Sequence, residues 1–386
     1  MTNTLKRRAQ QAVMAQRHAL VELSRELHAD PELGWAEYRS SERVSDVLKH
    51  AGFSVVRPYL GLETAFHAKA GAKAPSMRIG LMAEYDALPG LGHACGHNLI
   101  AASSVGAAIG LAQVAEELNI GVEVFGTPAE EGGGGKIDLL ERGAFDGLDL
   151  AMMVHPGPVD VARASPLAVA HWAVQFTGKA AHAASFPTEG INAADAFTIA
   201  QVAIGLLRQH LPTTSRVHGV VLDAGTAPNS IPAFARGRWY VRAQTLEELH
   251  EIEKRVLACF EAAALATGCS FDWELESKPY AEFHHDEQAL EFYSRNAESL
   301  GRVFQPDSPG AEMAAASTDM GNVSHIVPSI HPYIGLDSFP VLNHQQEFAD
   351  HTIGPTAEKA LLDGAIALAW TALDVATHRN LCTFSP

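Results

Sequence analysis

Short apolar runs alternate with helical patterns along the first 155 residues, and this alternation constrains the fold more than any other feature of the chain. The spacing of apolar residues predicts one amphipathic helix that ends near His28 and another over about Glu37–Ala51. Further helical patterns follow the third and fourth runs. The runs are Gly52–Val56, Ala65–Ala68, Ile79–Ala83, Val122–Phe125 and Leu150–Val154. Strands that alternate with helices are typical of a doubly wound α/β sheet, which is the fold class that we predict.

The pattern changes around Leu167. Residues 167–284 read as strand, helix, two strands, helix and strand, which is the order and the size, roughly 115 residues, of an independent ferredoxin-like α+β module. The chain then returns to helices and ends in a long apolar one, Thr356–Thr377, which needs a large sheet to pack on. We therefore expect residues 1–166 and 285–386 to form one domain, and residues 167–284 to be inserted in it.

Charge and composition restrict the partners of the chain. Its 386 residues carry 28 Lys and Arg against 45 Asp and Glu, and the net charge of −17 repels phosphate backbones and anionic membrane surfaces. We expect neither nucleic acid nor a membrane as a partner, and we predict that the uncharged stretch Asn98–Ala115 is a buried helix. No Cys-x-x-Cys pair occurs, and Met1–Leu20 holds no apolar signal segment. The expected location is therefore cytoplasmic.

Reactive side chains follow three of the apolar runs. In open α/β sheets ligands bind beyond the carboxyl ends of the strands, so these residues are expected to converge on one edge of the sheet. The segments are Glu84–Pro89 and Gly92–Asn98 after the run at 79–83, Pro128–Gly135 after the run at 122–125, and His155 after the run at 150–154.

Cysteine, histidine and carboxylate in these segments favour a metal site. Cys95 and His97 can approach one centre because Gly96 lets the backbone fold tightly, although the triplet alone also suits a buried thiol and a residue at the start of a helix. Glu130 and Glu131 precede four glycines, which makes a solvated helix unfavourable and leaves an exposed acidic loop as the alternative. Adjacent residues point in different directions, so one can bind metal while the other acts as a base. Nitrogen, thiolate and carboxylate together suit Zn²⁺ best, with Mn²⁺ or Co²⁺ also suitable, and the number of donors suggests two ions.

The motifs resemble the aminoacylase and carboxypeptidase family of co-catalytic metallohydrolases, metallopeptidase family 20. The resemblance rests on Glu84–Pro89, His93–His97, Pro128–Glu131, and Ala181–Ala183 with Pro187, Gly190, Asn192 and Ala193. Within that family the chain is most similar to the amidohydrolases that include aminobenzoyl-glutamate hydrolases, auxin-conjugate hydrolases and β-alanyl-type dipeptidases. The resemblance implies a di-metal peptidase-type doubly wound sheet whose inserted module serves as a lid and dimerisation domain.

The resemblance also implies roles for single residues. Glu130 matches the family's general base, and Asp86 matches a carboxylate that orients a ligating group. The residues that match the family's metal ligands are Cys95, His97, Glu131, His155 and His344. The implied activity is hydrolysis of a small-molecule amide, in which water activated by two divalent ions loses its proton to Glu130 and attacks the carbonyl carbon.

The inserted module holds three further residues that match the family. His182 matches a histidine that reaches the active site of the partner subunit, which implies a homodimer formed through this module. Asn229 matches a residue that contacts the substrate, and Arg242 resembles the family's carboxylate-binding arginine. Asp319, in a loop that resembles one near the family's site, reads equally well as part of a turn, and His331 could line the pocket.

One departure from the family pattern narrows the substrate. Many amidohydrolase relatives follow Cys-Gly-His with Asp-x-His, whereas Asn98–Ile100 stands here, which favours the aminobenzoyl-glutamate and dipeptidase side of the subfamily over auxin conjugates. Three alternatives to N-acyl amino acid hydrolysis stay open. They are a dipeptidase or carboxypeptidase of the same family, a thiol hydrolase with Cys95 as nucleophile and His97 as its base, and a metal-binding relative without catalysis.

Overall fold

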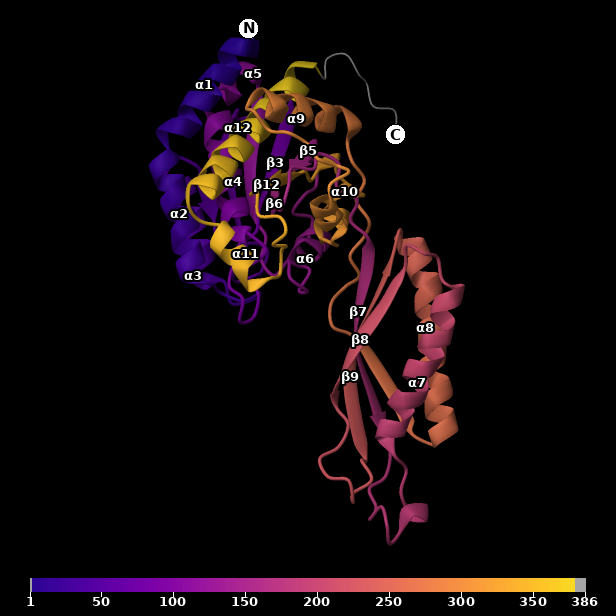
Figure 1. Cartoon of the computed structure of the whole chain (residues 1–386). Coiled ribbons are helices and arrows are strands. Elements are labelled where there is room, and N and C mark those ends of the chain that lie inside the picture. The colour runs from indigo at the N-terminus through magenta and orange to yellow at the C-terminus, as the bar shows by residue number, and fades with distance from the viewer. Residues whose placement is uncertain (1, 379–386) are drawn as a thin grey trace. The chain divides into compact units, whose positions relative to one another are not determined.

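The computed structural model describes residues 2–378. These residues divide into two compact units (Figure 1). Unit 1 consists of the chain up to Pro166 together with the chain from Phe283 onward, and unit 2 is the segment Leu167–Glu282. Each unit has a hydrophobic core of its own, because the largest cluster of buried side chains in each is drawn from that unit alone.

A six-stranded mixed sheet forms the centre of unit 1, in the order β1-β2-β4-β3-β5-β11. Its strands are β1 (Ser54–Val56), β2 (Phe66–Gly71), β3 (Met77–Ala83), β4 (Ile120–Gly126), β5 (Leu150–Met152) and β11 (Ser329–Ile330). Neighbours from β4 to β11 are parallel, whereas β2 pairs antiparallel with both β1 and β4. Two short parallel strands, β6 (His155–Gly157) and β12 (Tyr333–Gly335), follow β5 and β11. The predicted α/β class is confirmed, with an antiparallel edge added to the parallel sheet.

Helix α4 (His97–Ala112) is the central helix of unit 1. All of its residues from His97 to Leu111 are buried, and it packs against α1, α2, α12 and β3. The remaining helices of the unit are α1 (Thr2–Ala15), α2 (Arg17–Ala29), α3 (Tyr38–His50), α5 (Ala115–Leu118), α6 (Gly135–Glu141), α9 (Glu287–Ser299), α10 (Met320–Ser324), α11 (Gln346–His351) and α12 (Pro355–His378), with a 3₁₀ segment at Pro309–Ala315. Because α4 is buried and almost entirely apolar, it belongs to the core along most of its length. Only its first residue, His97, carries a reactive side chain.

The first and the last helical segments of unit 1 differ from what the sequence pattern alone suggests. The apolar spacing predicts a single first helix ending near His28, but the structure has two, α1 and α2, which meet at Gln16. Neither Gly nor Pro marks this break, so the pattern contains no sign of it. Helix α12 is long and apolar enough to cross a membrane by length and composition, yet 78% of its most apolar window is buried among the other elements of the unit.

Unit 2 is a four-stranded antiparallel sheet in the order β10-β7-β9-β8, with both helices packed on it. Its elements are β7 (Ala168–Thr177), α7 (Ala193–Leu207), β8 (Arg216–Asp223), β9 (Phe234–Ala243), α8 (Leu246–Thr267) and β10 (Ser270–Leu275), with 3₁₀ turns at Pro187–Glu189 and Arg208–His210. This is the βαββαβ topology of a ferredoxin-like fold. Buried aromatic side chains fill the space between sheet and helices, and they include Trp172, Phe176, Phe197, Trp239 and Phe260.

Candidate metal centre

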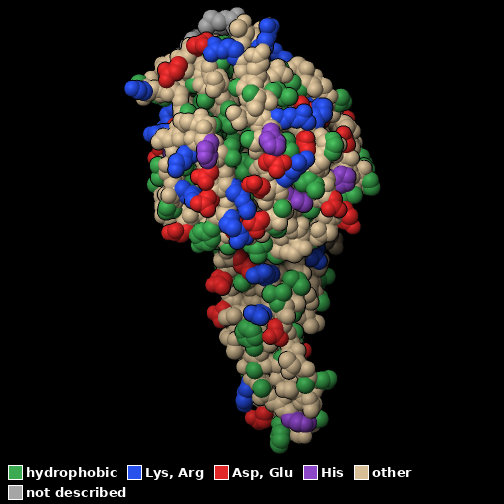
Figure 2. Space-filling model, turned by 90° about the vertical axis from the view of Figure 1, so that its left-hand side faces the viewer, with side chains coloured by type: hydrophobic (Ala, Val, Ile, Leu, Met, Phe, Trp, Pro, Cys, Tyr) green, Lys and Arg blue, Asp and Glu red, His purple; other side chains and the backbone are tan. Residues whose placement is uncertain are grey.

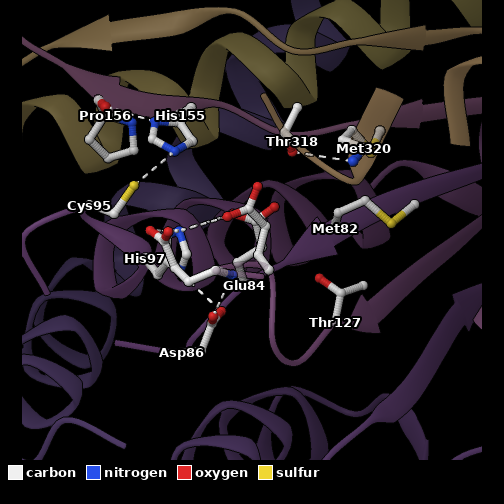
Figure 3. A network of polar contacts seen from close by, with 12 residues as sticks. Met82, Glu84, Asp86, Cys95, His97, Thr127, His155, Pro156, Thr318 and Met320 are labelled. Atoms are coloured by element: carbon white, nitrogen blue, oxygen red, sulfur yellow. Dashed lines mark hydrogen bonds and ion pairs between the residues drawn. The ribbon is translucent and has the colours of Figure 1, made fainter. Parts of the chain in front are cut away.

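Reactive side chains at the carboxyl ends of β3, β4 and β5 meet at one edge of the unit 1 sheet (Figure 3). Glu84 and Asp86 follow β3, Glu130 and Glu131 follow β4, and His155 opens β6 just beyond β5. The carboxyl ends of neighbouring parallel strands lie at the same edge, so these side chains are brought together although they are far apart in the sequence.

A left-handed glycine places Cys95 and His97 on this edge. Gly96 precedes α4 with φ of +88°, and a Cβ atom added there would lie 2.8 Å from the ring of Pro156. Only glycine combines this backbone conformation with so close an approach. The turn leaves Cys95 Sγ 3.5 Å from His155 Nε2, while His97 becomes the first residue of α4.

The loop before α11 brings His344 to the same place. The His344 backbone N–H donates to the carbonyl of Ala94 at 2.9 Å, and the Asn343 amide donates to the carbonyls of Cys95 and Pro156 at 3.3 and 3.0 Å. His344 itself has a left-handed φ of 68°. These contacts hold the imidazole of His344 with its Nε2 atom 3.3 Å from Glu131 Oε1.

The segment after β4 is a tight buried loop. The Ala129 backbone N–H donates to Glu37 Oε1 at 2.8 Å, and the Ala129 carbonyl accepts from the two backbone N–H groups of residues 133 and 134. A Cβ atom at Gly135 would lie 1.9 Å from the carbonyl oxygen of Pro128, so the glycine run is required for this path. Glu130 is only 6% exposed. The alternative of an exposed acidic loop is therefore wrong.

The donor atoms that the resemblance implies fall into two groups that share a thiol, and Glu84, His97 and Glu130 form a third group whose donor atoms lie within 4.8 Å of one another. Cys95 Sγ lies within 4.8 Å of donor atoms of His97 and His155, and within 4.8 Å of donor atoms of Glu131 and His344. The structure thus brings together all of the residues that the family resemblance implies as ligands. A thiolate common to both groups can serve two neighbouring cations.

Two observations indicate that the donor atoms can bind divalent ions: their spacing, and a buried nitrogen that lacks a hydrogen-bond partner. Bond lengths of 2.0–2.3 Å place two ligands of one tetrahedral ion about 3.3–3.6 Å apart. The distances of 3.5 Å between Cys95 and His155 and 3.3 Å between His344 and Glu131 lie in this range. His97 Nε2 is fully buried and makes no hydrogen bond to any described residue. A buried nitrogen without a partner is costly unless it ligates a cation.

Asp86 holds two of these residues in place. Its Oδ1 atom lies 3.1 Å from His97 Nδ1, and its Oδ2 atom accepts from the Glu131 backbone N–H at 2.9 Å. The contact with Nδ1 directs His97 Nε2 toward Cys95 and the carboxylates, as a carboxylate behind a ligating histidine does in metal sites. His155 is oriented in the same way, because its Nδ1 atom lies 2.8 Å from the Pro156 carbonyl oxygen.

Neighbouring charges favour the deprotonated, cation-binding forms of the two acidic donors, Cys95 and Glu131. Burial and the charge of Glu131 raise the pKa of Cys95, but His155 and His97 outweigh them and lower it to about 6. Burial also raises the pKa of Glu131, yet the hydrogen bond and the charge of His344 lower it to about 2. Thiolate and carboxylate are therefore present at neutral pH, and metal ligands must be deprotonated in this way.

Glu130 has the opposite electrostatic setting. Burial, followed by the negative charges of Glu84 and Glu131, holds the pKa of Glu130 well above its ordinary value. Its Oε2 atom lies 3.9 Å from His97 Nε2, at the edge of the donor groups. A carboxylate with a raised pKa next to a cation site is suited to accept and return a proton.

Unit 2 contains the other residues that the resemblance implies, at its two opposite ends. His182 is exposed and pairs with Ser230, and the Ala183 N–H donates to the Asn229 carbonyl at 2.9 Å, so His182 and Asn229 lie on adjacent loops. Arg242 lies near the other end of β9, opposite Val169. At about 3.3 Å per residue, the length of β9 separates Arg242 from these loops by roughly 25–30 Å within one chain.

Two residues of the edge, Glu84 and Lys136, have no role assigned from the sequence. Lys136 is fully buried, and its Nζ atom lies 2.6 Å from both Glu84 Oε1 and Asp319 Oδ1. Asp319 therefore belongs to a buried ionic cluster, rather than to an ordinary surface turn. His331 is also fully buried, with its ring centroid 5.5 Å from that of His155. A glutamate directly after a buried strand and a lysine directly after four glycines were the available signals.

Comparison with known proteins places the chain among related sequences and folds. Residues 80–366 match the family model for peptidase family M20/M25/M40. A Xaa-Arg dipeptidase of Mus musculus is 40% identical over 385 residues, which cover 96% of this chain and 89% of that protein. One of the p-aminobenzoyl-glutamate hydrolase subunits of Escherichia coli K12 is 33% identical over 286 residues, which cover 68% and 59%. A solved dinuclear metal binding peptidase of Bacillus subtilis superposes with a TM-score of 0.64 at 23% identity, covering 92% and 98%.

Proposed function

The chain belongs to peptidase family M20/M25/M40 and is a metal-dependent hydrolase of amide or peptide bonds, and we propose that its substrates are dipeptides and dipeptide-like N-acyl amino acids. The observation that carries this proposal is the juxtaposition of two donor groups sharing Cys95 with a buried carboxylate, Glu130, beside them. Binding alone has no use for a second carboxylate of raised pKa at that position, whereas hydrolysis does.

Each residue of the centre has a part in the proposed reaction. Two divalent ions, Zn²⁺ first and Mn²⁺ or Co²⁺ next, would supply a water of lowered pKa and polarise the substrate carbonyl. The residues that would hold them are Cys95, His97, Glu131, His155 and His344. Glu130 takes the proton of the attacking water and passes it to the leaving amine, for which its raised pKa is suited. Asp86 keeps the Nε2 atom of His97 directed into the site.

We propose that the preferred substrates carry a cationic residue at the carboxyl end. The relative named as a Xaa-Arg dipeptidase matches nearly the whole chain, and the net charge of −17 attracts cations to the protein. On the face shown in Figure 2, acidic and basic side chains are interspersed rather than gathered into one basic patch. The substrate carboxylate would be bound by Arg242 together with Asn229 of the partner subunit, because these two residues lie at opposite ends of unit 2 within one chain.

We further propose a homodimer formed through unit 2. Its edge strand β8 exposes Val220 and Leu222, and α7 exposes an apolar stripe made of Ile199, Val202 and Leu206. An open strand edge and an exposed apolar stripe favour association with a second copy, most simply with twofold symmetry. The separation of His182 from Arg242 along β9 supports a site that takes these two residues from different protomers.

Complementation between protomers tests whether His182 acts on the partner. Glu130→Gln and His182→Ala should each be inactive, but a mixed dimer would contain one site with both an intact Glu130 and an intact His182. We expect activity to reappear when the two variants are unfolded together and refolded as mixed dimers. A mixture that stays inactive while forming mixed dimers would contradict the role of His182 in the partner's site.

Amine release from a substrate panel tests the function itself. The panel comprises dipeptides ending in Arg or Lys, β-alanyl dipeptides, N-acyl and N-aroyl amino acids, and p-aminobenzoyl-glutamate, each measured before chelation, after it, and after Zn²⁺ or Mn²⁺ is restored. We expect chelator-sensitive release that is fastest from dipeptides with a cationic carboxyl-terminal residue. Faster cleavage of p-aminobenzoyl-glutamate would overturn the substrate preference. Release that survives chelation but not thiol alkylation would instead make Cys95 the nucleophile.

A further inference from the structure

Glu84 lies within the metal centre although it is not among the residues assigned to it. It directly follows β3, is fully buried, and faces the ring of His97, while Asp86 lies on the other side of that ring (Figure 3). Glu84 Oε2 lies 3.5 Å from His97 Nε2. Neither of these two atoms makes a hydrogen bond to any described residue. Two buried polar atoms without partners therefore point toward each other across a short gap.

A buried clamp determines how Glu84 is oriented. The Lys136 ammonium lies 2.6 Å from Glu84 Oε1 and 2.6 Å from Asp319 Oδ1, and the Lys136 backbone N–H donates to Asp319 Oδ2 at 2.9 Å. The clamp joins the end of β3 to the start of α6 and to the residue before α10. Because Lys136 engages Oε1, it is Oε2 that faces His97.

The charges of this cluster do not balance. Two carboxylates and one ammonium, −2 + 1, leave one negative charge among three fully buried side chains. An uncompensated charge in a buried site costs several kcal/mol, so a further cation is expected next to it. The carboxylate oxygen that Lys136 does not engage faces His97 Nε2, so the missing positive charge belongs at that position, as a proton on the imidazole or as a bound metal ion.

The distance between Glu84 and His97 agrees with ligation of one ion. Two tetrahedral ligands stand about 3.3–3.6 Å apart, and the pair of Glu84 Oε2 and His97 Nε2 is 3.5 Å apart. The corresponding distances from His97 Nε2 to the oxygens of Glu131 and Glu130 are longer, 3.8 and 3.9 Å. Among these carboxylates, Glu84 is therefore the one best placed to share an ion with His97.

We propose that Glu84 is a further ligand of the metal centre, which supplies Oε2 to the ion held by His97, and that Lys136 and Asp319 are its positioning residues. This inference rests on the metal centre proposed above. An added carboxylate makes the donor set of that ion richer in oxygen, which shifts its preference toward Mn²⁺ or Co²⁺ relative to a site of thiolate and imidazole alone.

Metal binding by Glu84→Gln tests the proposal without using activity. Glutamine keeps the shape and an oxygen for Lys136, but it turns an amide toward His97. Metal-free full-length protein should be titrated with Zn²⁺ and with Mn²⁺, and the Co²⁺-loaded protein should be examined by visible absorption. We expect two ions per wild-type chain, one of them bound at least ~10-fold more weakly by Glu84→Gln, with a changed Co²⁺ spectrum. Glu123→Gln is the matched control, because it neutralises a buried carboxylate on β4 that is paired with His67 and Arg78.

The outcomes separate this inference from the proposed function. Wild-type protein that binds neither ion would overturn the metal centre as a whole. Two ions bound by Glu84→Gln with unchanged affinity and an unchanged Co²⁺ spectrum would overturn the role of Glu84 alone. Should the variant fail to fold, a structure of the Zn²⁺-loaded wild type decides the matter, because ligation requires Glu84 Oε2 at about 2.0–2.2 Å from an ion.

Discussion

The sheet of unit 1 holds buried carboxylates in two places, at Glu123 and at the metal centre. The two places differ in how the negative charge of the carboxylates is neutralised. Glu123, on β4, lies 2.7 Å from His67 Nε2 and 2.6 Å from Arg78 Nε, so its own chain supplies a hydrogen-bonding imidazole and a compensating cation. At the metal end, Lys136 is shared between Glu84 and Asp319, and the glutamates after β4 lie close by. The same sheet therefore holds one cluster that is electrostatically complete and another that is short of positive charge.

The pKa values of the two clusters reflect this difference. Burial raises the pKa of Glu123, but the hydrogen bonds from His67 and Arg78 outweigh it and lower the value to about 2. Burial and negative neighbours instead hold the pKa of Glu130 well above its ordinary range. A completed ion-pair cluster stabilises the fold, whereas a cluster that lacks cations is suited to bind them.

Removing the metal ions should have the largest effect on turnover and stability. The carboxylates at the metal centre lack enough positive charge of their own, whereas Glu123 does not depend on the ions. We expect turnover to be abolished by chelation and recovered with Zn²⁺ or Mn²⁺. The loss of each ion should also lower the free energy of unfolding, by about 4 kcal/mol for an ion present at 1,000 times its Kd. Turnover and urea unfolding before and after chelation measure both effects. Full turnover in protein that metal analysis shows to be ion-free would contradict the prediction.

Glu130→Gln should have the next largest effect, on turnover alone. Loss of the general base is expected to lower kcat by about 10²–10⁴-fold while the bound metal content stays unchanged, because in the proposed mechanism Glu130 moves a proton and is not a metal ligand. The measurements are steady-state kinetics and metal analysis of the same preparation. Glu123→Gln serves as the control and should retain the wild-type kcat. A fully active Glu130→Gln variant would exclude the proposed role.

Asp86→Asn should weaken the metal centre without removing a ligand. Asparagine has one acceptor oxygen where Asp86 uses two, for His97 Nδ1 and the Glu131 N–H, so one of these ligands loses its support. We expect metal affinity to fall about 10–100-fold, measured by competition with a chromophoric chelator. Activity at saturating metal should recover in part. Unaltered affinity would show that Asp86 does not orient these ligands.

Glu123→Gln should have the smallest effect and should act on stability alone. The folded pKa of about 2 lies below the ordinary value of 4.5, so the contacts of ionised Glu123 with Arg78 and His67 stabilise the protein above about pH 5. This contribution is lost progressively as pH falls from about 4.5 to about 2. The variant should therefore unfold at lower urea than the wild type near neutral pH, by about 1–3 kcal/mol, and the difference should shrink in acid. A difference that is constant with pH would contradict the ion-pair explanation.

The local pattern predicts the elements of unit 1 and the edge at which the reactive residues meet. The apolar runs at 79–83, 122–125 and 150–154 correspond to β3, β4 and β5, and the residues after them lie together because those strands are parallel neighbours. The uncharged stretch after Gly96 is the buried helix α4, as its composition predicts. These features depend on periodicity and on residue type, which are properties of neighbouring positions.

Other features have no local signal. The break between α1 and α2 at Gln16 occurs without Gly or Pro. The apolar runs also do not indicate that β2 pairs antiparallel with both of its neighbours. In the sequence, nothing distinguishes Glu84 from other polar residues that follow a strand. Only the folded chain shows that Glu84 contacts the buried Lys136. For His331 the sequence suggests only that it could line the pocket, and the structure shows it fully buried next to His155.

By itself the sequence determined the main strands and helices, which residue types end the strands of the sheet, and which family the chain resembles. Only the tertiary structure decided how the buried charges are shared, as in the contact of Lys136 with Asp319, which lies 183 residues further along the chain. The physical reason is that strand and helix patterns arise from interactions between near neighbours. The desolvation and pairing of charges instead depend on distances between segments that only the folded chain brings together.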